Sequence, residues 1–233
     1  MSVRAEPLAR RRIYLVRHAE VSYFDAQGQP LDPRQVPLTE RGRQQAASAG
    51  SLLADIRFDL AVCSGLPRTE ETARHILHDH DLPLHAEPRL QEIRGGRLRE
   101  IPRENRERTI AYAYDSADQP GARFIGGELW SEFAMRVNQA WAQLIARDDW
   151  QNLLIVAHDA VNRVLLGQVI GSGLGGLKGF EQDPACINII EADIDAATIE
   201  RAFIRTLNLT AYDLIRPNQQ LTVMEKVWRD YRS

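Results

Sequence analysis

The feature that most constrains the fold is a set of short apolar runs that alternate with helical patterns. Three runs, at residues 13–16, 60–63 and 153–157, are too continuously apolar for strands with one face in water. A fourth run covers residues 187–190. We expect all four to be central, largely parallel strands. Alternating strands and helices predict an α/β fold, a three-layer α/β/α sandwich around a mostly parallel central sheet.

Helical periodicity fills the intervals between these runs. It is present in residues 39–53, 67–77 and 161–170, and in a longer stretch that places Phe133, Val137, Trp141, Leu144 and Ile145 on one face. Pro67 falls where a first helical turn tolerates a missing N–H. Near the end of the chain, residues 202–207 predict a last strand and residues 221–231 an amphipathic closing helix.

Two segments fit neither pattern. Residues 21–37 are rich in Pro, Gly and Gln, and residues 94–127 are dense in Arg, Gly and Pro. We expect both to be excursions over the edge of the sheet. With 233 residues, of which 44% are hydrophobic, the chain is long enough for a sizeable core, and one domain spanning residues 1–233 is the expectation.

The composition excludes several classes of partner and site. The formal net charge is -3 with acids and bases interspersed, which predicts neither a nucleic acid nor a membrane surface as partner. Cys63 and Cys186 form neither a disulfide framework nor a metal-ligand spacing, so we expect buried thiols. No segment of signal-peptide type follows the N-terminal arginines, and no run approaches ~18 apolar residues. We therefore expect a cytoplasmic protein.

The first apolar run ends in the pair Arg17-His18. In an open α/β sheet, ligands bind at the carboxyl ends of the strands. Arginine offers a planar fork of donors to phosphate or carboxylate, and histidine can be a neutral nucleophile near pH 7. The pair therefore predicts an oxyanion substrate, although an isolated Arg-His pair is more often a surface feature.

Three further elements repeat the order of strand, polar residues and helix. Arg68 falls in the first turn of a predicted helix, where free N–H groups and the helix dipole favour an anion. His158 ends the third apolar run, at a position that matches that of His18. Glu92 begins a loop after the second strand-helix unit, where a carboxyl group can serve as acid and base.

These residues lie in blocks whose order and spacing, over most of the chain, resemble the histidine phosphatase superfamily, also called phosphoglycerate mutase-like. The blocks are LVRHAE at residues 15–20, LTERG at 38–42, SGLPRTEETA at 64–73, LQEI at 90–93 and VAH at 156–158. The resemblance implies a phosphoglycerate mutase-like fold. It also implies a homodimer as a possible assembly.

Carried over residue by residue, the resemblance makes His18 the nucleophile, with Arg17, Arg68 and a protonated His158 around the transferred phosphoryl group. Glu92 would protonate the leaving oxygen and then deprotonate the attacking water. The implied function is phosphomonoester hydrolysis of a small phosphorylated metabolite through a phosphohistidine. Fixed positive charge suffices for such a transfer, so we expect no metal and no cofactor.

The chain departs from the family pattern at three places. Ala19 stands where the family often has Gly. Asp159 stands where Gly is common and its backbone N–H faces the phosphate, so we place it among the substrate-binding residues and expect its carboxylate to point outward. An inward carboxylate would repel phosphate and raise the pKa of His158. Residues 21–24, Val-Ser-Tyr-Phe, replace a Thr-x-x-Asn element, which predicts a remodelled substrate pocket.

Two other functions stay open at this point. A phosphoglycerate mutase-type phosphotransferase is the runner-up, although residues 94–127 do not resemble the lysine-containing segment of glycolytic mutases. A non-catalytic anion-binding regulatory module is the third hypothesis. Two clusters are set aside: the histidines at 75, 78, 80 and 85 as a zinc site, and the arginines at 94, 97, 99, 103, 106 and 108 as a mainly solvated face, some of which could line the pocket mouth.

Overall fold

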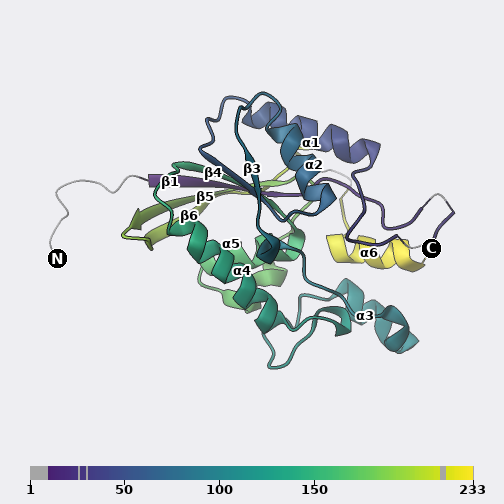
Figure 1. Ribbon diagram of the computed structural model, residues 1–233. Helices are drawn as coiled ribbons and strands as arrows, with labels where there is room; N and C mark the ends of the chain where they lie inside the picture. Colours follow the sequence, from purple (N-terminus) through teal and green to yellow (C-terminus); the bar gives the residue numbers. More distant parts are fainter. Residues whose placement is uncertain (1–9, 26, 30, 216–218, 233) are drawn as a thin grey trace.

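The computed structural model describes residues 10–25, 27–29, 31–215 and 219–232, without the side chain of Leu98. Within these residues six strands form one sheet in the order β3-β2-β4-β1-β5-β6. The strands are β1 (Arg10–Arg17), β2 (Leu60–Cys63), β3 (Leu84–Ala86), β4 (Asn152–Ala157), β5 (Ile187–Asp195) and β6 (Thr198–Leu209). The α/β class is confirmed, and helices cover both faces of the sheet (Figure 1).

The central strands are buried on both faces because each face meets a separate layer of helices. The helices are α1 (Glu40–Leu53), α2 (Pro67–Ile76), α3 (Arg106–Ala111), α4 (Trp130–Ile145), α5 (Asp159–Val169) and α6 (Val223–Arg232). Ile13 and Leu15 of β1 join the core formed with α4 and α5, whereas Tyr14 and Val16 join the core formed with α1 and α2. Alternate side chains of one strand therefore enter two cores, which explains the uninterrupted apolar runs.

The direction of β5 differs from the expectation. β1, β2, β3 and β4 are mutually parallel, but β5 runs antiparallel to β1, and β6 antiparallel to β5. The two strands form a hairpin whose turn residues, Ala196 and Ala197, both have positive φ. Such turns usually carry Asn or Gly, so the alanines gave no hairpin signal. β3 and α3 were likewise not expected; both are short and lack a clear apolar period.

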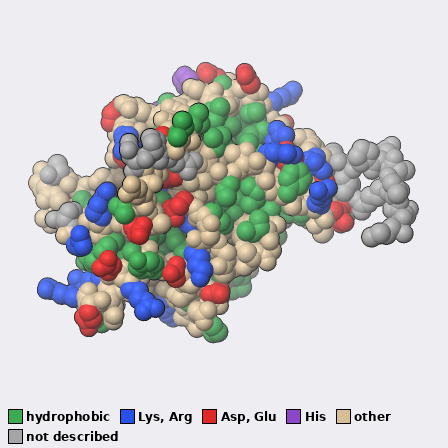
Figure 2. Space-filling view, turned by 180° about the vertical axis from the view of Figure 1, so that it is seen from behind, with side chains coloured by type: hydrophobic (Ala, Val, Ile, Leu, Met, Phe, Trp, Pro, Cys, Tyr) green, Lys and Arg blue, Asp and Glu red, His purple; other side chains and the backbone are tan. Residues whose placement is uncertain are grey.

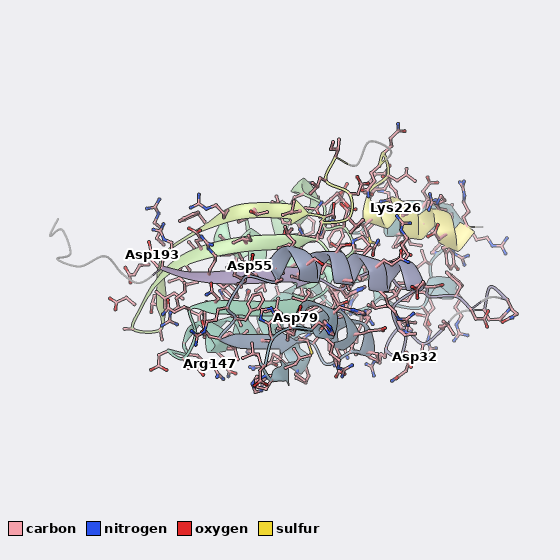
Figure 3. The ribbon with its side chains drawn as sticks, turned by 90° about the horizontal axis from the view of Figure 1, so that it is seen from above. Asp32, Asp55, Asp79, Arg147, Asp193 and Lys226 are labelled. Carbon is pink, nitrogen blue, oxygen red and sulfur yellow. The ribbon has the colours of Figure 1, made fainter. Side chains whose placement is uncertain are left out.

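The carboxyl ends of β1, β2 and β4 meet at one end of the sheet, and the irregular segments gather there. α3, from the second excursion, lies beside α6 at the end of the molecule away from the N-terminus (Figure 1). Asp32 of the first excursion and Lys226 of α6 occupy the same end (Figure 3). Seen from behind, acidic and basic side chains lie intermixed over this end (Figure 2). No helix of the described residues is long and apolar enough to cross a membrane.

Helices α1 and α2 approach closely through Gly50. A Cβ atom added at Gly50 would lie 2.6 Å from the backbone oxygen of His75 in α2. Alanine favours a helix over glycine by about 1 kcal/mol, but overpacking against backbone costs about 1–3 kcal/mol. The steric cost is larger than the gain in helix propensity here, because the backbone of His75 cannot rotate away from the added methyl group.

We therefore predict that Gly50→Ala lowers the free energy of unfolding by about 1–2 kcal/mol, measured by urea denaturation. Ser51→Ala, at the neighbouring exposed position of α1, is the control and should change that free energy by less than about 0.5 kcal/mol. A Gly50→Ala protein as stable as the parent would show that the two helices can separate without cost.

Candidate active site

The parallel pairing of β1 with β4 brings the two histidines of the sequence blocks together. Arg17 is in register with Ala157, so His18 and His158 leave the sheet side by side. Their ring centroids are 5.2 Å apart at an interplanar angle of 65°. His18 is 3% exposed and His158 is fully buried. The matching positions predicted from the sequence are therefore neighbours in space.

Backbone geometry fixes the tautomer of His18. Its Nδ1 lies 2.7 Å from the carbonyl oxygen of Ala19, which can only accept, so Nδ1 carries the proton. Nε2 then keeps its lone pair. Burial, followed by the nearby guanidinium groups of Arg68 and Arg17, lowers the pKa of His18 well below its ordinary value. The imidazole is neutral near pH 7, which is the form that a nucleophile requires.

Two arginines flank the histidine pair, Arg68, which is buried, and Arg17, which is half-buried. Arg68 is 3% exposed and sits in the first turn of α2, as the sequence predicted. Arg68 Nη1 donates to the Pro33 carbonyl oxygen at 2.6 Å, and Arg17 Nη1 donates to the carbonyl oxygen of Gln182. The Nε atoms of both arginines are buried without a hydrogen-bond partner among the described residues. Both guanidinium groups therefore keep donors for an oxyanion.

His158 is held by hydroxyl groups. Its Nε2 lies 2.8 Å from Ser64 Oγ, which in turn lies 2.9 Å from Thr69 Oγ1, while Nδ1 has no partner in the described part of the chain. Burial first, and then Arg68, His18 and Arg17, lower the pKa of His158 well below its ordinary value. Burial and these adjacent cations therefore favour the neutral form of His158 when no anion is bound, and its protonation beside a phosphoryl group stays a prediction.

Glu92 lies at the start of the loop after the short 3₁₀ turn Pro88–Leu90. Its Oε1 accepts from the Ile93 N–H at 3.0 Å, and its Oε2 lies 3.4 Å from the Ala160 N–H at the start of α5. Burial, followed by the charge of Asp159, raises the pKa of Glu92 to about 7. A carboxyl group with that pKa can both give and take a proton near neutral pH.

The loop that carries Glu92 is positioned by Arg136 of α4, which the sequence did not single out. Arg136 donates to the carbonyl oxygens of Arg89 and Gln91 at 2.7 Å and of Glu92 at 3.2 Å, and it pairs with Glu128 at 3.0 Å. Glu128 also accepts from the Arg94 N–H. Glu128 follows two glycines just before the longest predicted helix, but nothing in this sequence pattern points to a partner on α4.

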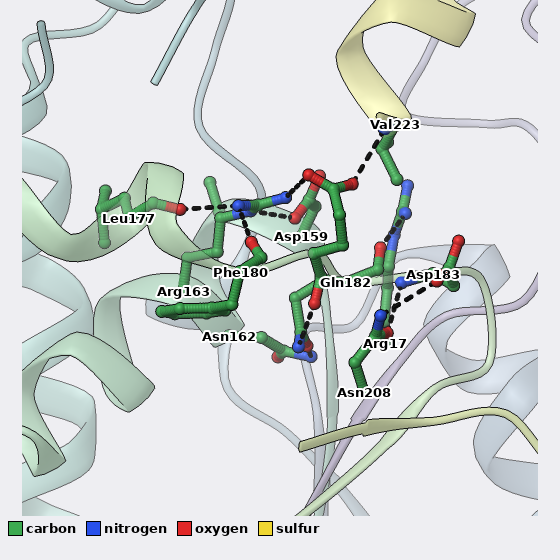
Figure 4. A network of polar contacts seen from close by, with 12 residues as sticks. Arg17, Asp159, Asn162, Arg163, Leu177, Phe180, Gln182, Asp183, Asn208 and Val223 are labelled. Atoms are coloured by element: carbon green, nitrogen blue, oxygen red, sulfur yellow. Dashed lines mark hydrogen bonds and ion pairs between the residues drawn. The ribbon is translucent and has the colours of Figure 1, made fainter. Parts of the chain in front are cut away.

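Asp159 contradicts the expectation that its carboxylate points outward. The side chain is 4% exposed, and its Oδ1 accepts from Arg163 Nε at 2.7 Å (Figure 4). Arg163 lies one helical turn further along α5 and is also bound by the carbonyl oxygens of Leu177 and Phe180. This buried cation compensates the carboxylate, so the aspartate can face inward. Its charge acts on the pKa of Glu92 rather than raising that of His158.

Two neighbouring cavities open onto this cluster. One, of about 750 Å³, includes His18, and the other, of about 660 Å³, includes Arg68, Glu92 and Asp159. Both excursions contribute to the walls, through residues 21–24 of the first, which line the larger cavity, and through side chains of the second such as Tyr114. Helix α6, expected only as a closing helix, lines both cavities.

Of the two clusters set aside from the sequence, only Arg94 reaches the described lining of the cavities. Arg94 lines the smaller cavity and pairs with Glu128, but Arg97, Arg99, Arg103, Arg106 and Arg108 do not belong to the described lining of either cavity. Among the described residues no three His, Cys, Asp or Glu side chains are grouped to hold a metal ion. Cys63 and Cys186 are free and buried, as predicted.

Comparisons with known proteins agree with the geometry. A model of the histidine phosphatase superfamily (branch 1) matches residues 13–205. The adenosylcobalamin/alpha-ribazole phosphatase of Escherichia coli is 32% identical over 193 residues, covering 81% of this chain and 93% of that protein. A probable phosphoglycerate mutase of Erwinia tasmaniensis is 31% identical over 166 residues, covering 69% of this chain and 75% of that protein.

A solved structure supports the same relationship. The alpha-ribazole phosphatase of Shigella flexneri superposes with a TM-score of 0.67 at 33% identity, covering 84% of this chain and 96% of that one. The phosphoglycerate mutase-like fold implied by the sequence blocks is confirmed.

The raised pKa of Glu92 makes a prediction about stability. The pKa of Glu92 in the folded protein is about 7, above the ordinary 4.5. The contribution of Glu92 to the free energy of unfolding is therefore complete below about pH 4.5 and is lost as pH rises through 7. Glu92→Gln removes the titration. Its free energy of unfolding relative to wild type should therefore rise by about 2 kcal/mol between pH 5 and pH 8, measured by urea denaturation.

Glu132→Gln, at an exposed glutamate of α4, is the matched control and should show no such gain. Parallel stability curves for wild type and Glu92→Gln would mean that Glu92 titrates like an exposed carboxyl group.

Proposed function

Since the chain belongs to the histidine phosphatase superfamily, we propose that it hydrolyses a small phosphomonoester through a phosphohistidine on His18 Nε2. One observation carries this proposal: a neutral imidazole whose Nδ1 proton is held by the Ala19 carbonyl oxygen lies near the guanidinium groups of Arg68 and Arg17. The lone pair of Nε2 is therefore available where positive charge gathers an oxyanion.

In the first step His18 Nε2 attacks phosphorus and the ester P–O bond breaks. Charge on the equatorial oxygens is met by Arg17 and Arg68, which are positioned before the substrate arrives and need little reorganisation. A bound phosphoryl dianion raises the pKa of His158 and favours proton donation from this third group. The unpartnered Nδ1 of His158 is the atom left for a phosphoryl oxygen.

Glu92 moves the protons. In its protonated form it gives a proton to the leaving alkoxide, and as a carboxylate it then takes a proton from the water that attacks the phosphohistidine. Phosphate leaves, His18 returns to its neutral form and Glu92 is protonated again. A pKa near 7 suits both half-reactions. No step needs a metal, because the arginines supply the charge.

The first candidate for the natural substrate is α-ribazole 5′-phosphate, since relatives of 31–33% identity that this chain matches over 93–96% of their length carry that activity in their names. A mutase acting on phosphoglycerate is less well supported. Phosphoglycerate carries a carboxylate as well as a phosphate. Three further arginines line the smaller cavity, Arg34, Arg94 and Arg136, and Glu128 engages the last two of them.

We place the reaction in a reducing compartment, the cytoplasm, because both cysteines are thiols. Cys63 and Cys186 are both buried and free. Secreted proteins of this size more often carry their cysteines as disulfides.

We predict that the wild-type protein releases phosphate from 4-nitrophenyl phosphate in the presence of a chelator and that His18→Ala lowers the rate by about 10³-fold or more. Rapid quenching with ³²P-labelled phosphomonoester should trap acid-labile, alkali-stable label on the wild type and none on His18→Ala. His75→Ala, outside the site, is the control. Inhibition by the chelator would contradict the proposal that no metal takes part.

A second prediction concerns the substrate. α-Ribazole 5′-phosphate should be hydrolysed with a kcat/KM at least about tenfold above that of 3-phosphoglycerate. Adding 2,3-bisphosphoglycerate should produce no interconversion of the phosphoglycerates, followed by NMR. Rapid interconversion with little free phosphate would instead establish the mutase.

A further inference from the structure

Helix α6 lies outside the family match, which ends at residue 205, yet it forms part of the site. Its start is defined by a reciprocal capping pair: the Thr222 N–H donates to Glu225 Oε2, and the Glu225 N–H donates to Thr222 Oγ1. The helix is therefore specified by its own sequence. Met224 and Trp228 pack on the core that contains α4 and α5.

Core packing does not explain why α6 carries apolar side chains on the side that faces the cavities. Val223 and Val227 line both cavities, together with Arg17 and Tyr23. Val227 is 39% exposed and belongs to no hydrophobic cluster among the described residues. An apolar side chain left in contact with a cavity rather than with the core is a surface for a ligand.

Beside its charged residues, the smaller cavity has apolar side chains from more than one element. Residues from the second excursion and from α6 together give this cavity the side chains Tyr114, Phe124, Ile125, Val223, Met224 and Val227. The phosphate-binding Arg68 and the proton donor Glu92 line the same cavity. The space beyond the phosphoryl group is therefore where the leaving alcohol lies, and its surroundings favour apolar or aromatic groups.

A chain of charged groups fastens α6 to the catalytic cluster. The Val223 N–H, one of the free donors of the first turn, donates to Glu181 Oε2 at 2.9 Å. Glu181 Oε1 accepts from Arg163 Nη2 at 3.1 Å, and Arg163 pairs with Asp159 (Figure 4). Lys226 adds an ion pair with Asp183 at 3.9 Å. The start of α6 is thus held at a fixed place relative to the residue that follows His158.

We propose that α6 is the specificity wall of this phosphatase, and that it selects phosphomonoesters whose alcohol carries an apolar ring. This inference rests on the proposed function and adds the substrate class and the element that recognises it. Val227 contacts the ring, and Glu181 positions the helix. Small polar alcohols gain nothing from this wall.

The test compares kcat/KM for 2-phenylethyl phosphate and glycerol 3-phosphate, two unactivated esters that differ in the ring. The wild type should prefer the ring ester by about tenfold or more. Val227→Asn should lower this preference by about tenfold, whereas Val227→Leu should keep it. Arg232→Gln, at an exposed position of α6 outside both cavities, is the matched control and should change neither value.

Glu181→Gln tests the fastening separately. Its KM for the ring ester should rise several-fold more than its KM for glycerol 3-phosphate, and amide hydrogen exchange in α6 should speed up. A preference that is the same in wild type and Val227→Asn would overturn the inference while leaving the phosphatase intact.

If the wild type hydrolyses neither ester, nor 4-nitrophenyl phosphate, the proposed function fails. Calorimetric binding of the same two esters then decides the inference, because a wall made by α6 still binds the ring ester more tightly and loses that difference in Val227→Asn.

Discussion

The site depends on two guanidinium groups, that of Arg17 at the end of β1 and that of Arg68 in the first turn of α2, whose Nε atoms are both buried. Burying a charge costs several kcal/mol unless partners compensate it. Backbone carbonyl oxygens of Gln182 and Pro33 meet part of this need, and they belong to the segments that close the site. Burial and the same positive charge lower the pKa of both His18 and His158, since each lies near both arginines. The proposed nucleophile and the proposed anion site are therefore linked through the electrostatics of these two arginines.

Amide side chains connect Arg17 to the central sheet. Gln182, whose carbonyl oxygen binds Arg17, pairs through its side-chain amide with that of Asn188 at 2.8 Å. Asn188 lies on β5 and donates to the Leu15 carbonyl oxygen of β1. Asn208 of β6 donates to Asp183 in the same network (Figure 4). The antiparallel strands β5 and β6 thus serve the site, because they place a buried polar network beside the first catalytic strand.

Much of this was predictable because the decisive signals are local. Continuous apolar runs located β1, β2 and β4, and the polar residues at their ends located His18, Arg68 and His158. The features that the sequence did not predict depend on contacts between residues far apart in the sequence, or on structure that has no sequence signature. The Ala196-Ala197 turn carries no hairpin signal. The spacing of Asp159 and Arg163 is typical of an exposed helical ion pair, and only the packing of α5 shows that both are buried. Arg136 donates hydrogen bonds to a loop that lies 44 or more residues earlier in the sequence.

Asp159 departs from the family pattern, and the residues around it both compensate its charge and connect it to other parts of the structure. A carboxylate beside a phosphate-binding cluster would oppose substrate binding if its charge were unopposed. Arg163 offsets that charge, and Arg163 in turn needs further acceptors, which Leu177, Phe180 and Glu181 provide. Glu181 has a second oxygen, and the first turn of α6 uses it. The substitution at one position of α5 therefore raises the pKa of Glu92 on one side and ties a C-terminal helix to the site on the other. Removing the aspartate would leave the buried guanidinium group of Arg163 partly uncompensated, so the carboxylate that lines the smaller cavity also stabilises the structure around it.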